Sequence, residues 1–262
     1  MYTEEVLSGT VVERIAYRSD GLRVNGYLAR PKREGVFPLL IWNRGGSNDY
    51  GSLDDLTAYL ILASTALWGY VVLATQYRGN RGSEGVEDWG GADVNDAINL
   101  IDVARELPYC DVDRIAIEGA SRGGMTTYRA LTMYDRFRCA ITHAGLADTF
   151  EILKHRNDLG AFVFKKFGHL PDETRDEELA RRSATRFADR LPRHTPILLM
   201  HGTADTVVPI EQSQLLVREL QRHHIPHKFI PIEGGQHIAL KDGSYRIIDQ
   251  HRREWLEIHM KL

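Results

Sequence analysis

The sequence is poor in cysteine, in long apolar runs and in excess charge of either sign, and each shortage excludes a class of protein. Its two cysteines, Cys110 and Cys139, are too few for a disulfide framework, and isolated thiols are typical of a reducing compartment. There are 33 Lys and Arg against 36 Asp and Glu, and the formal net charge is −3. This balance gives no electrostatic reason to expect a nucleic acid or an anionic membrane surface as a partner.

Segments that direct a chain to or through a membrane are also missing. No apolar run approaches the roughly 18 residues that span a bilayer. The first residues, Met1 to Glu5, carry neither the basic nor the apolar part of a secretory signal. We therefore expect a cytoplasmic protein without a membrane partner. We also expect Cys110 to lie in a loop after Pro108, and Cys139 to be buried and inert.

Nucleotide-binding signals are weak. The stretch from Gly79 to Gly91 is rich enough in glycine to suggest a phosphate cradle, but no Gly-Lys-Ser/Thr follows it. A Gly-x-Gly-x-x-Gly motif is likewise absent. We therefore expect no cofactor.

Apolar runs alternate with helical periodicity along most of the chain. Two alternating segments, 11–17 and 22–29, predict antiparallel strands at the start. The later runs predict strands at 37–42, 70–74, 114–118, 138–142, 196–200 and 228–232, with helices between them at 56–67, 92–107, 125–132, 211–222 and 245–259. Such alternation predicts an α/β fold with a doubly wound, mostly parallel sheet.

Residues 146–194 break this rhythm. They are rich in charge and include three closely spaced phenylalanines, Phe162, Phe164 and Phe167. These three form either the core of this segment or a pocket for an acyl group or side chain. We expect a single domain over 1–262 in which 146–194 is a mostly helical, cap-like insertion over the site.

A serine motif stands between a predicted strand and a predicted helix. Gly119-Ala120-Ser121-Arg122-Gly123 places a serine on a tight turn, where small residues on either side avoid a clash with the backbone. The N–H of Arg122 would lie at a helix N-terminus, where it could stabilise an oxyanion. Taken alone, the motif could equally be a glycine-rich turn.

An aspartate and a histidine follow in matching positions. Asp205 comes after the 196–200 strand, and His237 after the 228–232 strand. Residues at the carboxyl ends of parallel strands meet at one edge of the sheet. We therefore expect Ser121 as nucleophile, His237 as general base and Asp205 as the group that orients the histidine.

Other residues could take these roles. His201 is a rival base, although its place on the same strand end as Asp205 favours a structural hydrogen bond. Asp148 is a rival acid. The run His223-His224-x-x-His227 invites a metal site but has no carboxylate or cysteine partner nearby in the sequence, so we expect no bound metal.

Several blocks resemble a known family. They are 77–82 (Tyr-Arg-Gly-Asn-Arg-Gly), 89–96 (Trp-Gly-Gly-Ala-Asp-Val-Asn-Asp), 119–124 with the serine motif, 201–209 (His-Gly-Thr-Ala-Asp-Thr-Val-Val-Pro) and 235–237 (Gly-Gln-His). Together they resemble the α/β-hydrolase superfamily and, within it, the catalytic domain of the prolyl oligopeptidase (S9-type serine peptidase) family. The resemblance implies that Ser121, Asp205 and His237 are the triad. The N-terminal β-propeller of full-length members has no counterpart in this sequence.

The resemblance also implies a second oxyanion donor in the loop after the 37–42 strand. That loop reads Asn43-Arg44-Gly45-Gly46-Ser47, so Arg44 stands where the family has histidine or tyrosine. A backbone N–H of Gly45 or Gly46 remains as the donor. The predicted hole is therefore the N–H of Arg122 together with Gly45 or Gly46.

The expected function is that of a serine hydrolase that forms an acyl-enzyme, a small S9-like peptidase acting on peptides or acyl-peptides. The alternatives are a carboxylesterase acting on small esters and a non-catalytic binding domain that keeps the fold. The expected partner is a small molecule or short peptide, and a homo-oligomer remains open.

Overall fold

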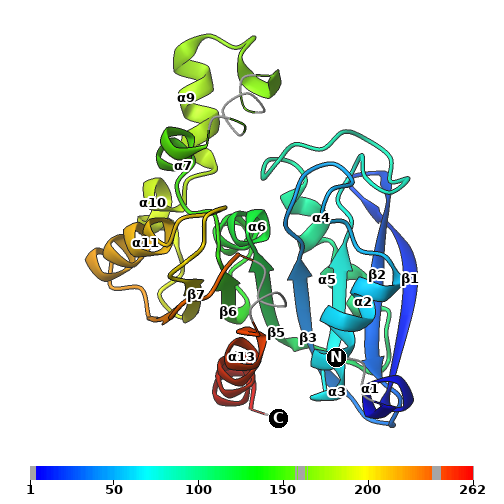
Figure 1. The fold of residues 1–262 in the computed structure, drawn as a ribbon. Helices are drawn as coiled ribbons and strands as arrows, with labels where there is room; N and C mark the ends of the chain where they lie inside the picture. The colour runs from blue at the N-terminus through cyan, green and yellow to red at the C-terminus, as the bar shows by residue number, and fades with distance from the viewer. Residues whose placement is uncertain (1–3, 157, 159–162, 164, 238–242, 262) are drawn as a thin grey trace.

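The chain folds around one eight-stranded sheet with the strand order β1-β2-β4-β3-β5-β6-β7-β8 (Figure 1). The computed structural model describes residues 4–156, 158, 163, 165–237 and 243–261. The strands are β1 (Thr10–Ser19), β2 (Leu22–Pro31), β3 (Phe37–Asn43), β4 (Val71–Thr75), β5 (Cys110–Ala120), β6 (Phe137–His143), β7 (Ile197–Gly202) and β8 (His227–Ile232). β1 pairs with β2, and β2 with β4, in antiparallel fashion; the remaining pairs are parallel.

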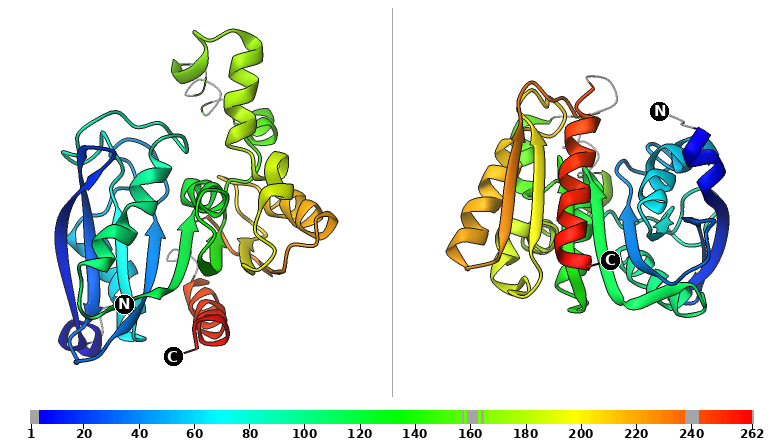
Figure 2. Two further views of the ribbon diagram at one scale, coloured as in Figure 1. Left: turned by 180° about the vertical axis from the view of Figure 1, so that it is seen from behind. Right: turned by 90° about the horizontal axis from the view of Figure 1, so that it is seen from below.

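Helices cover both faces of the sheet (Figure 2). Successive residues of a strand point to opposite faces, so Val71 and Leu73 of β4 belong to one apolar cluster, and Val72 and Ala74 to the other. The first cluster contains residues of α4 (Val94–Ile98), α5 (Leu100–Arg105), α6 (Arg122–Leu131), α10 (Ala184–Phe187) and α11 (Glu211–Arg222). The second contains residues of α2 (Asp55–Ala58), η1 (Tyr59–Ala63), α3 (Ser64–Leu67) and α13 (Tyr245–Met260). The predicted doubly wound α/β fold with antiparallel first strands is confirmed.

The segment between β6 and β7 is helical, as expected. Its described helices are α7 (Thr149–His155), α9 (Asp172–Arg181), α10 and η2 (Ala188–Arg190). In Figure 1, α7 and α9 extend away from the sheet. Phe162 and Phe164 lie outside the described residues, whereas Phe167 is buried against a cluster that includes Trp89 and Met125.

Several predicted boundaries were wrong. Cys110 does not lie in a loop; it begins β5, and burial raises the pKa of its thiol to about 12. A short helix, α1 (Glu4–Gly9), precedes β1. The predicted helix 92–107 is two helices that meet at Asn99, and the middle of the predicted helix 56–67 is the π-helical turn η1. Among the described helices, none is both long and apolar enough to cross a membrane.

Candidate active site

Ser121 lies in the turn between β5 and α6, in a backbone conformation that few residues adopt. Its φ of 57° and ψ of −123° lie outside the regions ordinarily allowed for L-residues. The flanking glycines permit the turn: a Cβ on Gly119 would lie 2.1 Å from the carbonyl oxygen of Gly123, and one on Gly123 would lie 2.0 Å from that of Asn43. The structure therefore contains the tight strand-to-helix turn that the motif predicts.

The hydroxyl of Ser121 faces His237 and not its own helix. It makes no capping hydrogen bond to α6, and its Oγ lies 3.1 Å from Nε2 of His237. On the other side of the ring, Nδ1 of His237 lies 2.7 Å from Oδ2 of Asp205. Asp205 follows β7 and His237 follows β8, so the loops after three strands bring together the three residues that their order in the sequence singles out.

The carboxylate of Asp205 is buried and fully engaged. Its Oδ1 accepts hydrogen bonds from the backbone N–H groups of Val207 and Val208, while Oδ2 faces His237. Burial alone would raise the pKa of Asp205, but interactions with His201 and His237 and the N–H of Val208 outweigh it and hold the pKa well below its usual range. Asp205 therefore stays ionised at neutral pH.

The rival residues have structural partners. His201 is buried, with Nδ1 2.7 Å from the Ser213 hydroxyl and Nε2 2.7 Å from the carbonyl oxygen of Val208. Asp148 caps α7, where its Oδ1 accepts from the N–H groups of Phe150 and Glu151. Neither takes part in the contact between Ser121 and His237.

The candidate oxyanion donors border Ser121 on two sides. Arg122 begins α6, so its N–H is one of the first-turn donors that a helix leaves without an internal acceptor. A Cβ on Gly45 would lie 3.0 Å from Cβ of Ser121 and 3.6 Å from its Oγ, so Gly45 lies directly beside the Ser121 hydroxyl. Gly46 instead approaches its own loop, because a Cβ there would lie 2.0 Å from the carbonyl oxygen of Tyr50.

The side chain of Arg122 has a role that the sequence reasoning missed. It is buried and forms ion pairs with Glu87 and Asp93, and its Nη1 donates to the carbonyl oxygen of Gly46 at 2.9 Å. Glu87 also accepts from the N–H of Asn48 at 2.9 Å. The serine turn, the loop after β3 and the glycine-rich segment 79–91 are thus joined through one guanidinium group. The available signal was Glu87 within that segment and Asp93 just after it.

The side chain of Arg44 holds the loop after β3 through hydrogen bonds to backbone carbonyls. Its guanidinium is buried and donates to the backbone carbonyls of Gln76, Gly45, Tyr50 and Asn48. Burial lowers its pKa. The residue that departs from the family pattern therefore holds the shape of the loop that carries Gly45 and Gly46.

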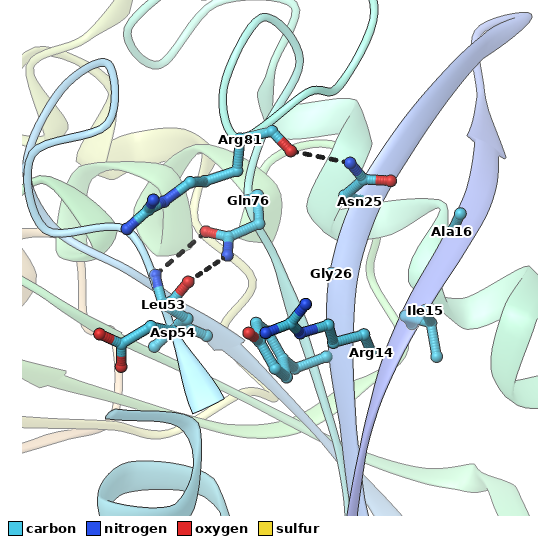
Figure 3. Close-up of a pocket in the computed structure, with 10 residues that line it drawn as sticks. Arg14, Ile15, Ala16, Asn25, Gly26, Leu53, Asp54, Gln76 and Arg81 are labelled. Atoms are coloured by element: carbon cyan, nitrogen blue, oxygen red, sulfur yellow. Dashed lines mark hydrogen bonds between the residues drawn. The ribbon is translucent and has the colours of Figure 1, made fainter. Parts of the chain in front are cut away.

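A cavity of about 430 Å³ lies away from these residues and is lined by none of Ser121, Asp205 and His237. Figure 3 shows it between β1, β2 and the segment around Leu53, with Gln76 bonded to Leu53 and Asn25 to Arg81. Within the described ranges, no group of three or more His, Cys, Asp or Glu side chains is arranged to hold a metal ion.

A serine and a histidine in contact at the end of a doubly wound sheet, with a buried aspartate behind the histidine, define the class of α/β-hydrolase enzymes. The model of the prolyl oligopeptidase family matches residues 57–262. The chain therefore belongs to that family and is a serine hydrolase.

Individual relatives agree with this assignment. The chain is 34% identical to the uncharacterized peptidase YtmA of Bacillus subtilis over 81% of its own length and 80% of the relative's. A puromycin-hydrolyzing peptidase of Mycobacterium tuberculosis matches with a TM-score of 0.77 and 26% identity over 95% of this chain. Acylaminoacyl peptidase of Pyrococcus horikoshii matches in fold, with a TM-score of 0.76 and 24% identity over 97% of this chain. The chain spans only 39% and 42% of these two solved chains.

Proposed function

We propose that the chain is a serine peptidase that cleaves short peptides or acyl-peptides through Ser121, His237 and Asp205. The observation that carries this proposal is the line of contacts from Oγ of Ser121 to Nε2 of His237 at 3.1 Å and from Nδ1 to Oδ2 of Asp205 at 2.7 Å. The names of several relatives, among them the uncharacterized peptidase YtmA and dipeptidyl-peptidase 5 of Porphyromonas gingivalis, support a peptide substrate.

In the proposed reaction, Oγ of Ser121 attacks the acyl carbon while His237 takes the hydroxyl proton on Nε2. The N–H of Arg122 and that of Gly45 or Gly46 stabilise the resulting oxyanion. His237 then gives the proton to the leaving amine, and the acyl group remains on Ser121. A water molecule, deprotonated by His237, attacks this ester, and the proton returns to Oγ as the acid leaves. Asp205 holds the ring and stabilises its charged form throughout.

We further propose that the insertion 146–194 controls access to Ser121 within a single 1–262 domain. Two of its side chains contact loops on different sides of the site. Nη1 of Arg156 donates to the carbonyl oxygen of Val207 at 2.6 Å, close to Asp205. Nζ of Lys166 donates to the carbonyl oxygen of Glu87 at 2.6 Å, and Glu87 binds Arg122.

The nucleophile is tested by replacing it. Because the acyl-enzyme requires the hydroxyl, Ser121→Ala should lower kcat by a factor of about 10⁴ or more and abolish labelling by a fluorophosphonate probe. The exposed Ser8→Ala should change neither. Substantial turnover by Ser121→Ala would contradict the assignment, and the absence of an adduct on the folded wild-type chain would favour the non-catalytic binding domain.

The substrate class is tested by a panel of aminoacyl amides, acyl-peptides and p-nitrophenyl esters. The proposal expects amide cleavage to accompany ester cleavage. Strong ester turnover with no cleavage of any amide would instead assign a carboxylesterase.

A further inference from the structure

A second cavity lies between three segments that are distant in the sequence. Its volume is about 330 Å³, and it is lined by the segment from Asp88 to Asn95, the end of α6 and the end of α9. These elements are found around the labels α4, α6 and α9 in Figure 1. Ser121, Asp205 and His237 are not among its lining residues.

Three of the lining residues are arginines: Arg129, Arg181 and Arg182. Only two carboxylates, those of Asp88 and Glu178, line the same cavity. The guanidinium of Arg190 lies close enough to act on the charge of Arg129 as well. This local excess of positive charge contrasts with the formal net charge of −3 of the whole chain.

Both carboxylates are already bound by other arginines. Arg182 is buried and donates to the carboxylates of Asp88 and Glu178 as well as to the carbonyl oxygens of Asp88, Trp89 and Glu178. The other oxygen of Glu178 lies 3.0 Å from Nη1 of Arg181. Arg182 is therefore satisfied, and neither carboxylate is left for Arg129.

Arg129 is the residue without a counter-charge. Among the described residues, no carboxylate lies within ion-pair distance of its guanidinium, and its buried Nε has no hydrogen-bond partner. The guanidinium carbon of Arg129 lies 5.8 Å from the centre of the Phe187 ring. Burial lowers its pKa, and the like charges of Arg190, Arg182 and Arg181 lower it further, against the opposing effect of Glu178.

The guanidinium of Arg129 is held near those of Arg190, Arg182 and Arg181, whose like charges repel it. An anionic ligand would relieve this repulsion and accept charge-assisted hydrogen bonds. We propose that this cavity binds a small oxyanion, a phosphate or carboxylate group, between Arg129 and Arg181. The planar guanidinium offers two parallel N–H donors to such a group. The site is separate from the proposed reaction at Ser121 and does not depend on it.

Thermal unfolding at constant ionic strength tests the site. Sodium phosphate or sodium acetate replaces part of the sodium chloride, so that the two arms distinguish a phosphate from a carboxylate ligand. At least one anion should raise the Tm of the wild-type chain, because ligands that bind the folded state stabilise it. Isothermal titration with the same anion should give a Kd at least tenfold weaker for Arg129→Met. Arg181→Met, whose side chain is largely exposed, should weaken binding in the same direction without disturbing the core.

The Tm of Arg129→Met in chloride alone distinguishes a ligand site from a packing role. Removal of an uncompensated charge should leave this Tm unchanged or raise it, whereas loss of a structural contact with Phe187 would lower it. The exposed Arg136→Met serves as the control and should keep the anion response. No Tm gain for the wild type with either anion, or an equal gain in Arg129→Met and Arg181→Met, would overturn the proposal.

Discussion

Ser121 has a strained backbone, and such strain costs on the order of 1–3 kcal/mol. Backbone hydrogen bonds maintain it: its N–H donates to the carbonyl oxygen of His143 in β6, and its carbonyl oxygen accepts from Gly124 in α6 and from Leu146 in the loop after β6. With φ at 57°, the hydroxyl is directed to His237 and does not cap α6. A single residue thus combines a strained conformation with an available hydroxyl, the arrangement that a nucleophile requires.

The carboxylate of Glu87 is predicted to act as a positioning group for the oxyanion donors. It binds Arg122 and the N–H of Asn48, so its charge holds both sides of the proposed hole together. Glu87→Gln should lower kcat roughly 10- to 100-fold, because small displacements of reacting groups are costly. KM should change little, and Glu34→Gln, in an exposed loop, is the control. Steady-state kinetics on the best panel substrate provide the measurement; a fall in folded fraction with normal kcat per folded molecule would contradict this role.

His143 is predicted to make stability depend on pH. It lies at the end of β6, and its Nε2 has no hydrogen-bond partner among the described residues. Burial, with the nearby His201 and His237, lowers its pKa from 6.5 to about 4. Between these values the unfolded chain binds a proton that the folded chain does not, so stability falls as the pH falls from about 6.5 to 4.

This dependence should amount to about 3 kcal/mol in the free energy of unfolding. His143→Gln removes the titrating group, so urea unfolding of the variant should lose correspondingly less stability between pH 7 and pH 4. The control is His155→Gln, on the exposed end of α7, which should keep the wild-type slope. Equal slopes for His143→Gln and the wild type would show that His143 does not titrate in this way.

The helices and strands show which parts of the fold can be predicted from sequence. β3 and β4 are buried on both faces, so their continuous apolar runs indicate them directly. The break between α4 and α5 involves a distant residue. The hydroxyl of Tyr17 in β1 donates to the carbonyl oxygen of Asp96 at 2.6 Å. In a continuous helix, this oxygen would instead accept from the N–H four residues later. Local periodicity carries no information about such a contact.

The same distinction applies to the site. The sequence shows the order of Ser121, Asp205 and His237 and the strand that precedes each of them. It therefore predicts that the three residues meet at one edge of the sheet. The buried ion pairs of Arg122 cannot be seen in the sequence, because the direction of its side chain depends on where segment 79–91 folds. That segment suggested a phosphate cradle, whereas in the structure its Glu87 binds Arg122.

The insertion 146–194 is predicted to affect which substrates reach Ser121. Replacing both contact residues, as Arg156→Met with Lys166→Met, should release the insertion from the loops at Val207 and Glu87. KM for long acyl-peptides should then change by more than KM for a p-nitrophenyl ester, with kcat for the ester retained. Arg175→Met, on α9, is the matched control. An equal change for long and short substrates would show that the insertion does not control access.

At the scale of the whole molecule, one buried ion pair joins the C-terminal helix to the central sheet. Arg252 of α13 donates through Nε and Nη2 to the two oxygens of Glu118 in β5, at 2.6 and 2.8 Å, and Nη2 also donates to Thr65 of α3 at 2.9 Å. Both side chains of the pair are less than 10% exposed, at 8% and 7%. Removal of Arg252 would leave the buried carboxylate of Glu118 without its counter-charge, whereas removal of Glu118 would leave Arg252 its ion pair with the partly exposed Asp249, 2.7 Å away.

The pair is therefore predicted to be strongly coupled. Arg252→Met should lower the free energy of unfolding by about 3–5 kcal/mol, and Glu118→Leu should lower it by less, because Asp249 still pairs with Arg252. The double variant should lose much less than the two single variants together. Urea unfolding of the four proteins measures the coupling, and the exposed pair Arg136 and Asp113, 2.9 Å apart, should give a coupling of no more than about 1 kcal/mol in the same cycle. If the losses at Glu118 and Arg252 simply add, α13 is held by the burial of its own Trp255 and Leu256 in the apolar cluster and not by this charge pair.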